Sequence, residues 1–385
     1  MNPSGATVCF LNASGQPGGG EIALAQLASA VPGAKVVLFE PGPAEDLLRS
    51  KGLPVELHLL PESVRSVKKE SGFEGPRVAW AVLAHAWSLS RKLRGFDVVH
   101  CNNQKAWVVG AIASFLARRP VVWHLHDILS TEHFSRAKIR LGVGLSKLLN
   151  AKVIANSQAS AAAFVAQGGN ADRLEVLYNP VDPTPFREAK PIEGLRQELG
   201  IPEGEPIWGV FSRLASWKGQ HVAIEALSRL RRGHLLLVGA PFFGEEPWEA
   251  KLRLQVRELG LEGRVHFLGF RKDIPRLLAS IDGAIHASTL AEPFGLVILE
   301  AQLAGKPVVA SAAGGALEIV EHGVTGWLVP PSDPAALADV LLRWIEHPSE
   351  VALIGRNSSG TASAKFDLQR LSDRFREILQ EESRR

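Results

Sequence analysis

The chain has 385 residues, of which 46% are apolar and 22% are charged, and its formal net charge at pH 7 is +3. This length exceeds what one hydrophobic core normally supports and predicts two domains, while the composition excludes a disordered or fibrous protein. No apolar run is long enough to cross a bilayer, and the first residues lack a charged and then apolar leader, so we expect a cytoplasmic protein.

Residues 1–180 alternate short apolar runs with helical patterns. Helix-like stretches such as Glu21–Ala30 and Arg77–Leu93 separate the runs. Apolar strands that alternate with helices predict a parallel sheet covered on both faces. The expected strands are Val8–Leu11, Val36–Phe39, Val98–His100, Val121–Leu125, Val153–Ala155 and Glu175–Leu177.

The only two cysteines, Cys9 and Cys101, fall at or beside these strands. We expect small buried side chains in a reducing compartment, although the sequence leaves a disulfide open.

Two groups of residues in this half follow expected strands and could meet a ligand. Gly18, Gly19 and Gly20 precede the first helix, where glycines let the backbone approach a phosphate at an open helix N-terminus. His124 and His126 lie at the end of an expected strand and share a face of it. An H-x-H pair is typical of metal sites, but no other residues complete a ligand set at a consistent spacing, so we predict no metal site. A buried structural histidine is the alternative for His124.

Basic residues are concentrated in the first half of the chain. Residues 1–180 carry 19 Lys and Arg against 13 Asp and Glu, whereas residues 181–385 carry 24 against 27. The clusters are either solvated helix faces or a patch for an anionic acceptor or the inner face of a membrane. Few aromatic residues interleave with them, which argues against nucleic acid as a partner. The clustered residues are Arg65, Lys68, Lys69, Arg77, Arg91, Lys92, Arg94, Arg136, Lys138, Arg140 and Lys147.

A Pro-rich segment at residues 179–186 lacks periodicity and is predicted to be a linker, neither strand nor helix. The strand and helix pattern then restarts, and Asp333-Pro334 begins a helix over Ala335–Ile345. A last helix, roughly Phe366–Gln380, carries one apolar face. The strands expected in this half are Ile207–Phe211, Leu235–Val238, Val265–Leu268, Gly283–His286, Val308–Ala310 and Gly326–Val329.

Arg213 and Lys218 come just after the first strand of the second half. Arginine offers a planar fork to two phosphate oxygens and lysine a point charge, so the pair suits a diphosphate whose charge grows as it departs. Surface charges at the same spacing are the alternative interpretation.

Glu292-Pro293-Phe294-Gly295, followed by Glu300, forms a strand-loop-helix unit in which residues 295–304 are the expected helix. Glu300 lies beside the apolar stripe of this helix, where a carboxylate is costly unless a polar group meets it. Two acids near the end of a parallel strand suit a ligand with hydroxyls, and the helix N-terminus suits its phosphate. For Glu292, an acid that only complements the helix dipole is the alternative.

These motifs together resemble those of the family 4 retaining glycosyltransferases. The Glu292 to Glu300 unit matches the family's pair of glutamates around Pro-Phe-Gly, and Ser212-Arg213-Leu214 with Lys218-Gly219 matches its diphosphate clamp. Gly18–Gly20 resembles the N-terminal glycine loop. The segment 179–182 resembles Asn-Gly-Val-Asp with proline in place of glycine, and residues 314–326 match the C-terminal block.

The resemblance implies a GT-B fold, in which two Rossmann-like parallel-sheet domains face a central cleft. The expected domains are residues 1–184 for the acceptor and residues 185–365 for the donor, with the helix at 366–385 crossing back to the first domain. The implied catalytic residues are Arg213, Lys218, Glu292 and His126, the last near the donor sugar. The implied donor-binding residues are Gly18, Gly19, Gly20, Phe270, Phe294, Gly295, Leu296 and Glu300, of which Glu300 accepts from the ribose and Phe270 adjoins the base.

The activity implied is retaining transfer of a hexose-type sugar from a nucleoside-diphosphate sugar, most often a UDP-sugar, to a hydroxyl acceptor such as a glycolipid, a polysaccharide or a small molecule. No cofactor besides the donor is expected, and the chain has no Asp-x-Asp, which fits a metal-independent site. The alternatives are a nucleotide-sugar epimerase of the same fold, a non-catalytic nucleotide-sugar binding protein, and a metal hydrolase built on His124 and His126.

Overall fold

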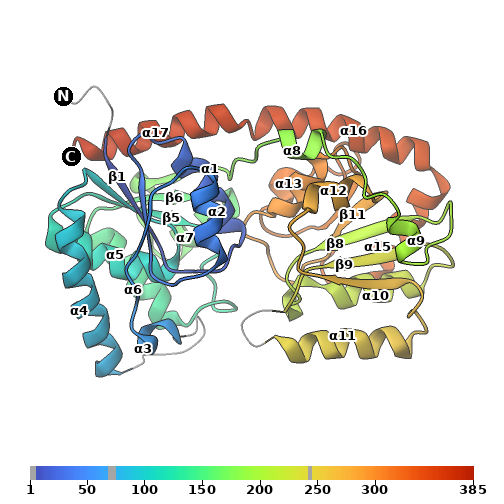
Figure 1. Ribbon diagram of the computed structural model, residues 1–385, viewed down its shortest axis with the longest axis horizontal. Coiled ribbons are helices and arrows are strands. Elements are labelled where there is room, and N and C mark those ends of the chain that lie inside the picture. The colour runs from blue at the N-terminus through green and yellow to red at the C-terminus, as the bar shows by residue number, and fades with distance from the viewer. Residues whose placement is uncertain (1–5, 68–74, 242–244) are drawn as a thin grey trace. The chain divides into compact units, whose positions relative to one another are not determined.

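The computed structural model describes residues 6–67, 75–241 and 245–385. The chain divides into two compact units, one made of Met1–Pro180 with Leu368–Arg385 and the other of Val181–Asp367 (Figure 1). Each unit is a parallel sheet with helices on both faces, as the alternation of apolar strands and helices predicts.

Seven parallel strands form the sheet of the first unit, in the order β3-β2-β1-β4-β5-β6-β7. All six strands expected from the sequence are present, and β3 was not predicted because it is a short edge strand without a buried residue. The strands are β1 (Val8–Asn12), β2 (Lys35–Leu38), β3 (Val55–Leu57), β4 (Val98–Cys101), β5 (Val121–Leu125), β6 (Lys152–Ala155) and β7 (Leu174–Val176).

Helices cover the two faces of this sheet, and the period-2 alternation of its strands sorts their side chains between them. In Figure 1, α17 lies above the sheet while α4 and α6 lie below it. Leu11 and Trp123 pack with Trp107 of α5 in one core, whereas Phe10 and His124 turn to the opposite face and contact Phe375 of α17. The helices are α1 (Gly19–Ser29), α2 (Pro43–Ser50), α3 (Glu62–Arg65), α4 (Pro76–Leu93), α5 (Gln104–Ala117), α6 (Arg136–Leu148), α7 (Gln158–Ala166), η1 (Ala171–Arg173) and α17 (Leu368–Ser383).

Both cysteines are buried free thiols, as expected from their positions in β1 and β4. Burial raises the pKa of Cys9 to about 12, so this thiol is inert as a nucleophile near neutral pH.

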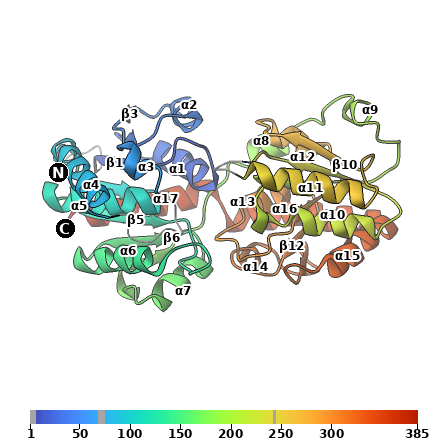
Figure 2. The same cartoon turned by 90° about the horizontal axis from the view of Figure 1, so that it is seen from below.

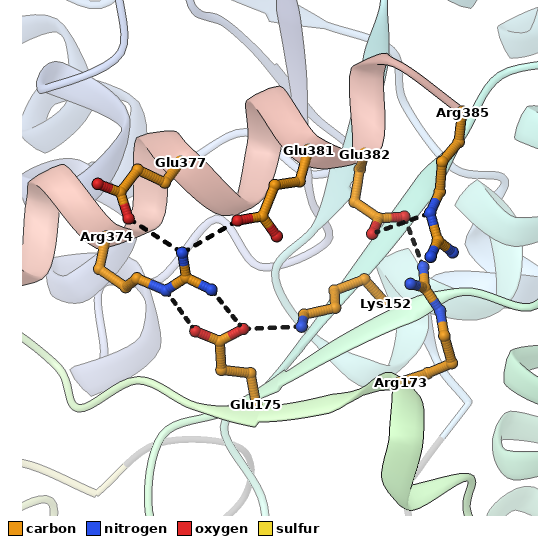
Figure 3. Close-up of polar contacts among 8 residues, drawn as sticks. All are labelled: Lys152, Arg173, Glu175, Arg374, Glu377, Glu381, Glu382 and Arg385. Carbon is orange, nitrogen blue, oxygen red and sulfur yellow. Dashed lines mark hydrogen bonds and ion pairs between the residues drawn. The ribbon is translucent and has the colours of Figure 1, made fainter.

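Charged residues tie α17 to the edge of this sheet (Figure 3). Arg374 donates to both carboxylate oxygens of Glu175 in β7, at 2.6 and 3.1 Å, and Lys152 pairs with the same carboxylate at 2.7 Å. Arg173 meets Glu382 at 2.5 Å, and their side chains are only 11% and 6% exposed. Removing one partner of an ion pair buried in this way would leave the other charge unpaired, which is strongly destabilising.

Six parallel strands form the sheet of the second unit, in the order β10-β9-β8-β11-β12-β13. They correspond to the six strands expected from the sequence. The strands are β8 (Ile207–Phe211), β9 (His234–Val238), β10 (Val265–Gly269), β11 (Gly283–His286), β12 (Val308–Ser311) and β13 (Trp327–Val329).

The helices of the second unit also lie on both faces of its sheet, with α12 and α13 on one side and α10 and α11 on the other (Figures 1 and 2). The helices are α8 (Thr184–Arg187), α9 (Leu195–Glu198), η2 (Ser216–Lys218), α10 (Gln220–Ser228), α11 (Glu246–Glu258), α12 (Ile274–Ala279), α13 (Leu296–Leu303), α14 (Ala316–Ile319), α15 (Pro334–Glu346) and α16 (Pro348–Lys365).

The prediction that residues 179–186 contain no helix is wrong at their end. A single helical turn, α8, begins at Thr184, whose N–H donates to Asp182 Oδ1 at 2.9 Å. Pro185 then stands in the first turn, where its fixed φ suits a helix and its missing N–H costs nothing. Within the described ranges 6–67, 75–241 and 245–385, no helix has the length and apolar character needed to cross a membrane.

Candidate functional site

The strand order of the second unit reverses between β8 and β11. β8 pairs on one side with β9, the next strand along the chain, and on the other side with β11. In open parallel sheets, ligands bind beyond the carboxyl ends of the strands at such a switch point. Lys218 follows β8 and Glu292 follows β11, so both predicted residues lie at the switch point.

Lys218 and Glu292 form an ion pair at this position. Lys218 Nζ lies 2.6 Å from Glu292 Oε2, and the two side chains are 15% and 14% exposed. The same oxygen accepts a hydrogen bond from Ser288 Oγ at 3.2 Å and lies 3.4 Å from His286 Nε2. The nitrogen of Lys218 also lies 4.0 Å from the centre of the Trp217 ring. Three groups thus converge on one carboxylate oxygen and hold its orientation, and the fourth, Trp217, lies beside the lysine.

The ionised state of Glu292 depends on these neighbours. Burial by itself raises the pKa of this carboxyl, but Lys218 and His286 outweigh burial and hold the pKa well below its ordinary value. Glu292 is therefore a carboxylate at neutral pH and can accept hydrogen bonds from hydroxyl groups.

Two glycines allow the loops that carry this pair to approach closely. A Cβ at Gly219 would lie 1.7 Å from the carbonyl oxygen of Ala287, and one at Gly314 would lie 2.2 Å from that of Glu292. Both glycines have positive φ, 70° and 63°, which side chains rarely adopt. The backbone of the Glu292 loop is also fixed from outside, because Gly315 N–H donates to the Glu292 carbonyl at 2.8 Å.

Arg213 lies two residues after the end of β8 and has polar neighbours of its own. Its Nη1 is 3.0 Å from Glu245 Oε2, and its guanidinium centre is 5.7 Å from the centre of the Trp217 ring. Gln220 donates to the Arg213 carbonyl at 2.8 Å and so holds the backbone of this loop. The Trp217 ring therefore lies near both predicted cations.

Glu300 lies in the second turn of α13 and is partly buried. Burial raises the pKa of its carboxyl to about 8. Among the residues that the structure describes, no group donates a hydrogen bond to this carboxyl or pairs with it. Burying a charged carboxylate beside the apolar stripe of α13 would be costly. Protonation of Glu300, and not a polar partner, avoids this cost.

The remaining predicted residues of this unit flank the two acids or lie further along the sheet. Phe294 is 2% exposed and packs edge-on against Phe366, with ring centroids 5.7 Å apart. Gly295 is the N-cap of α13 and Leu296 is its first residue. Phe270 follows the edge strand β10 and is 50% exposed.

In the first unit, the strand order reverses between β1 and β4, and the predicted residues lie beyond this second switch point. Gly18 caps α1 and its N–H donates to Glu21 Oε2 at 3.1 Å, and Gly19 begins the helix. The structure brings Gly20 and His126 together, since a Cβ at Gly20 would lie 3.5 Å from the His126 ring. His124 is fully buried, and its ring centroid is 4.1 Å from that of His126, so the two rings share a face as expected.

Sequence reasoning missed several polar residues at both switch points. His286 and Ser288 contact Glu292, and Asn102 contacts His126 at 3.0 Å. The available signal was position, because His286 ends β11 and Asn102 directly follows β4. No group of three or more His, Cys, Asp or Glu that could hold a metal ion occurs in the described part of the chain.

The residues of the basic clusters in the first unit have different neighbours. Arg65 pairs with Glu62 and Lys92 with Glu56, as solvated helix faces do. Lys68 and Lys69 lie outside the described residues. On α4, in contrast, Arg91 lies over the ring of Trp87 at 3.7 Å from its centre.

Two family models together match most of the chain. The model for glycosyl transferases group 1 matches residues 191–384, and the model for glycosyltransferase family 4 matches residues 17–184. Curated relatives are similar over part of their length. A D-inositol 3-phosphate glycosyltransferase of Corynebacterium efficiens is 30% identical over 68% of this chain and 66% of its own length. An uncharacterized glycosyltransferase of Methanocaldococcus jannaschii, MJ1607, is 29% identical over 63% of this chain and 64% of its own. The chain thus matches a little under two thirds of the length of these relatives.

Solved structures match the chain from end to end. Anabaena Alr3699/HepE in complex with UDP and glucose is 42% identical, covers 97% of this chain and 99% of its own, and has a TM-score of 0.88. The same protein in complex with UDP-glucose gives a TM-score of 0.88 with 42% identity over 98% of this chain and all of its own.

Proposed function

The chain belongs to the group 1, family 4 glycosyltransferases with the GT-B fold, and from that membership we propose that it transfers a hexose from a UDP-sugar to a hydroxyl acceptor with retention of configuration. The observation that carries the proposal is the largely buried Lys218–Glu292 ion pair at the switch point of the second unit. In this pair, a cation that can meet a diphosphate lies beside a carboxylate that can accept hydrogen bonds from sugar hydroxyls. The transfer of a sugar from a diphosphate requires both at one end of the sheet.

We assign the charge of the departing diphosphate to Lys218 and Arg213. A side chain that stabilises charge as it develops lowers the barrier of the chemical step, and two cations make a divalent metal unnecessary. Glu292 accepts from hydroxyls of the donor sugar, and Glu300 from those of the ribose. Gly18, Gly19, Gly20 and His126 contribute from the first unit, and Phe270, Phe294, Gly295 and Leu296 complete the donor-binding set.

UDP-glucose is the donor that we propose first. HepE, which is 42% identical to this chain over nearly its whole length, has been crystallised with UDP-glucose and with UDP and glucose. The acceptor is a compound with a free hydroxyl, a glycolipid or polysaccharide first, and its recognition is assigned to residues 1–180.

The proposed reaction proceeds on one face of the sugar. The bond between the anomeric carbon and the diphosphate oxygen breaks, and the acceptor oxygen bonds to the same face of that carbon. The acceptor proton passes to the departing diphosphate, which Lys218 and Arg213 stabilise. No side chain of the first unit is assigned as a nucleophile.

We also propose that the first unit contacts an anionic membrane through α4, on the inner face of the membrane. Trp80, Leu83 and Trp87 recur at helical spacing on this helix and are 73%, 48% and 55% exposed. The helix contains no acidic residue, and Arg77 and Arg91 stand on its exposed surface. Exposed tryptophans beside arginines are typical of helices that lie in the interface of an anionic bilayer.

The test of the proposed activity is incubation of the full chain with UDP-, GDP-, ADP- and dTDP-sugars, with UDP-glucose expected to raise the melting temperature most. Acceptor screening with that donor should then release the nucleoside diphosphate and give an α-linked product by NMR when the donor is α-linked, with and without a chelator. An inverted product, or loss of activity with the chelator, would contradict the proposal. Formation of an epimer from the donor alone would instead favour an epimerase, and tight donor binding without turnover would favour a binding protein.

A further inference from the structure

Three asparagines near Gly20 form a chain of hydrogen bonds whose direction the backbone fixes. Asn12 Nδ2 donates to the carbonyl of Ser14 at 2.8 Å. A carbonyl oxygen can only accept, so the nitrogen of this amide must face Ser14 and the oxygen must face the other way. Asn12 Oδ1 then accepts from Asn102 Nδ2 at 3.1 Å and from Asn103 Nδ2 at 2.8 Å.

The orientation of Asn102 is fixed a second time by an independent group. Its Nδ2 also donates to the carbonyl of Gly20, at 3.1 Å. A flipped amide would set its oxygen against both this carbonyl and Asn12 Oδ1, and would lose two hydrogen bonds at once. Asn102 Oδ1 is therefore the atom that faces His126 Nε2, at 3.0 Å.

This arrangement determines where His126 carries its proton. An amide oxygen can only accept, so Nε2 must be the protonated nitrogen of the ring. Burial lowers the pKa of His126 to about 4, with the charge of Asp127 acting in the opposite direction, so the ring is neutral at pH 7. A neutral ring protonated at Nε2 has its lone pair at Nδ1, and this atom is buried without a hydrogen-bond partner among the described residues.

The ring of His126 is also held in place by its neighbours. The ring of His124 lies against it with a centroid distance of 4.1 Å and an interplanar angle of 33°, and Gly20 lies beside it. His124 is in turn bonded to His100 at 3.2 Å, and burial lowers the pKa of both rings, so neither brings a positive charge. A ring flip of His126 would set a C–H group against Asn102 Oδ1 and lose the hydrogen bond.

We propose that Asn102 is a positioning residue that locks His126 as the Nε2–H tautomer and thereby presents Nδ1 as the acceptor for a hydroxyl of the sugar substrate. The tautomer follows from this chain alone, whereas the identity of the hydroxyl rests on the proposed function. An unpaired buried acceptor is unfavourable, and a hydroxyl that donates to Nδ1 removes this penalty on binding. Asn12 is a second positioning residue, since it accepts a hydrogen bond from Asn102 and so orients the Asn102 amide.

The tautomer can be measured without substrate. In the full chain labelled with 15N-histidine, two-bond proton–nitrogen correlations distinguish Nε2–H from Nδ1–H rings, and His126→Gln assigns the signal. We expect His126 of the wild type to be protonated at Nε2 at pH 7. We expect Asn102→Ala to give a mixture of tautomers, and Asn170→Ala to leave the signal unchanged, because Asn170 caps η1 and contacts no histidine.

An Nδ1–H ring in the wild type would overturn the proposal, and so would an unchanged tautomer in Asn102→Ala. The wild-type spectrum decides the matter even if the variant does not fold. A second readout concerns binding, where Asn102→Ala should bind UDP as the wild type does but lose about tenfold in affinity for the UDP-sugar, the value of one hydrogen bond. Equal losses for both ligands would refute the role of Nδ1. If the tautomer is as expected and no nucleotide sugar binds, the proposed function fails and the positioning role of Asn102 stands.

Discussion

Glu300→Gln is expected to stabilise the protein at alkaline pH while weakening the binding of UDP. The pKa of Glu300 is raised to about 8 by burial, from an ordinary value of 4.5. Below pH 4.5 the carboxyl is protonated in the folded and in the unfolded chain, and its titration does not affect stability. Above that pH the unfolded chain releases the proton while the folded chain retains it, so stability falls as the pH rises and the loss is complete above the folded pKa.

The magnitude follows from the span of this titration. At about 1.4 kcal/mol per pH unit, the roughly 3 units between pH 5 and pH 8 correspond to a loss of about 4 kcal/mol. Since the side chain is only partly buried, contact with solvent reduces this to about 2 kcal/mol. The glutamine variant has no proton to release, so its free energy of unfolding lacks this decline.

Urea unfolding of the wild type and of Glu300→Gln at pH 5, 6, 7 and 8 measures the difference directly. The two proteins should be equally stable at pH 5, and the variant should be more stable by about 2 kcal/mol at pH 8. Glu346→Gln is the control, because this substitution makes the same chemical change at an exposed position of α15. A difference between wild type and Glu300→Gln that does not vary with pH would refute the buried titration. In isothermal titration above pH 8, where Glu300 is ionised, the variant should bind UDP about tenfold more weakly, since a carboxylate accepts from hydroxyls better than an amide does.

Three further predictions concern the charged pair, α4 and α17. Lys218→Ala should lower kcat roughly a hundredfold or more, because a group that stabilises the departing charge is lost. Replacing Trp80 and Trp87 by serine should abolish sedimentation of the full chain with vesicles that contain phosphatidylserine, and raised salt should weaken sedimentation of the wild type. Glu382→Ala should lower the free energy of unfolding by about 3 kcal/mol, because Arg173 is left as a buried unpaired charge.

Each of these predictions has a matched control. Lys251→Ala on α11 should keep full activity, and a wild-type rate in the Lys218 variant would remove that residue from the site. Leu342→Ser changes an exposed apolar residue of the other unit and should not affect vesicle binding, whereas loss of binding in both variants would exclude a specific role of α4. Glu377→Ala on α17 removes an exposed partner of Arg374, and an equal loss of stability in this variant would contradict the importance of burial.

The sheets could be predicted because their strands are continuous apolar runs. Such runs can be recognised from the local sequence without knowing which strands lie beside them. The unpredicted elements depend on tertiary contacts. β3 is an edge strand with only one neighbour, and α16 contains a Ser- and Gly-rich stretch with little intrinsic preference for a helix. Its small residues lie close to α13, where Ser359 donates to the carbonyl of Leu303 at 3.1 Å.

The candidate site likewise contains residues that the sequence pattern identifies and residues that depend on tertiary contacts. Lys218 and Glu292 could be chosen from the sequence because each follows a strand within a recognisable motif, and the structure brings them together at 2.6 Å. His286 and Asn102 were not chosen, since their position at a strand end is the only signal and does not by itself distinguish a site residue from other polar residues. Their roles depend on which strands are neighbours across the reversal of strand order, and this information is absent from local spacing.

The two acids of the site, eight residues apart, differ in charge because their surroundings push their pKa values in opposite directions. Lys218 holds Glu292 as a carboxylate, whereas burial without a partner keeps Glu300 protonated near neutral pH. The switch point of the second unit therefore carries one negative charge fewer than its composition suggests, so the proposed diphosphate would meet Lys218 and Arg213 with less opposing charge nearby. If Glu300 ionises as it accepts from the ribose, UDP binding releases a proton near pH 7, and the measured heat of binding must then depend on the ionisation enthalpy of the buffer.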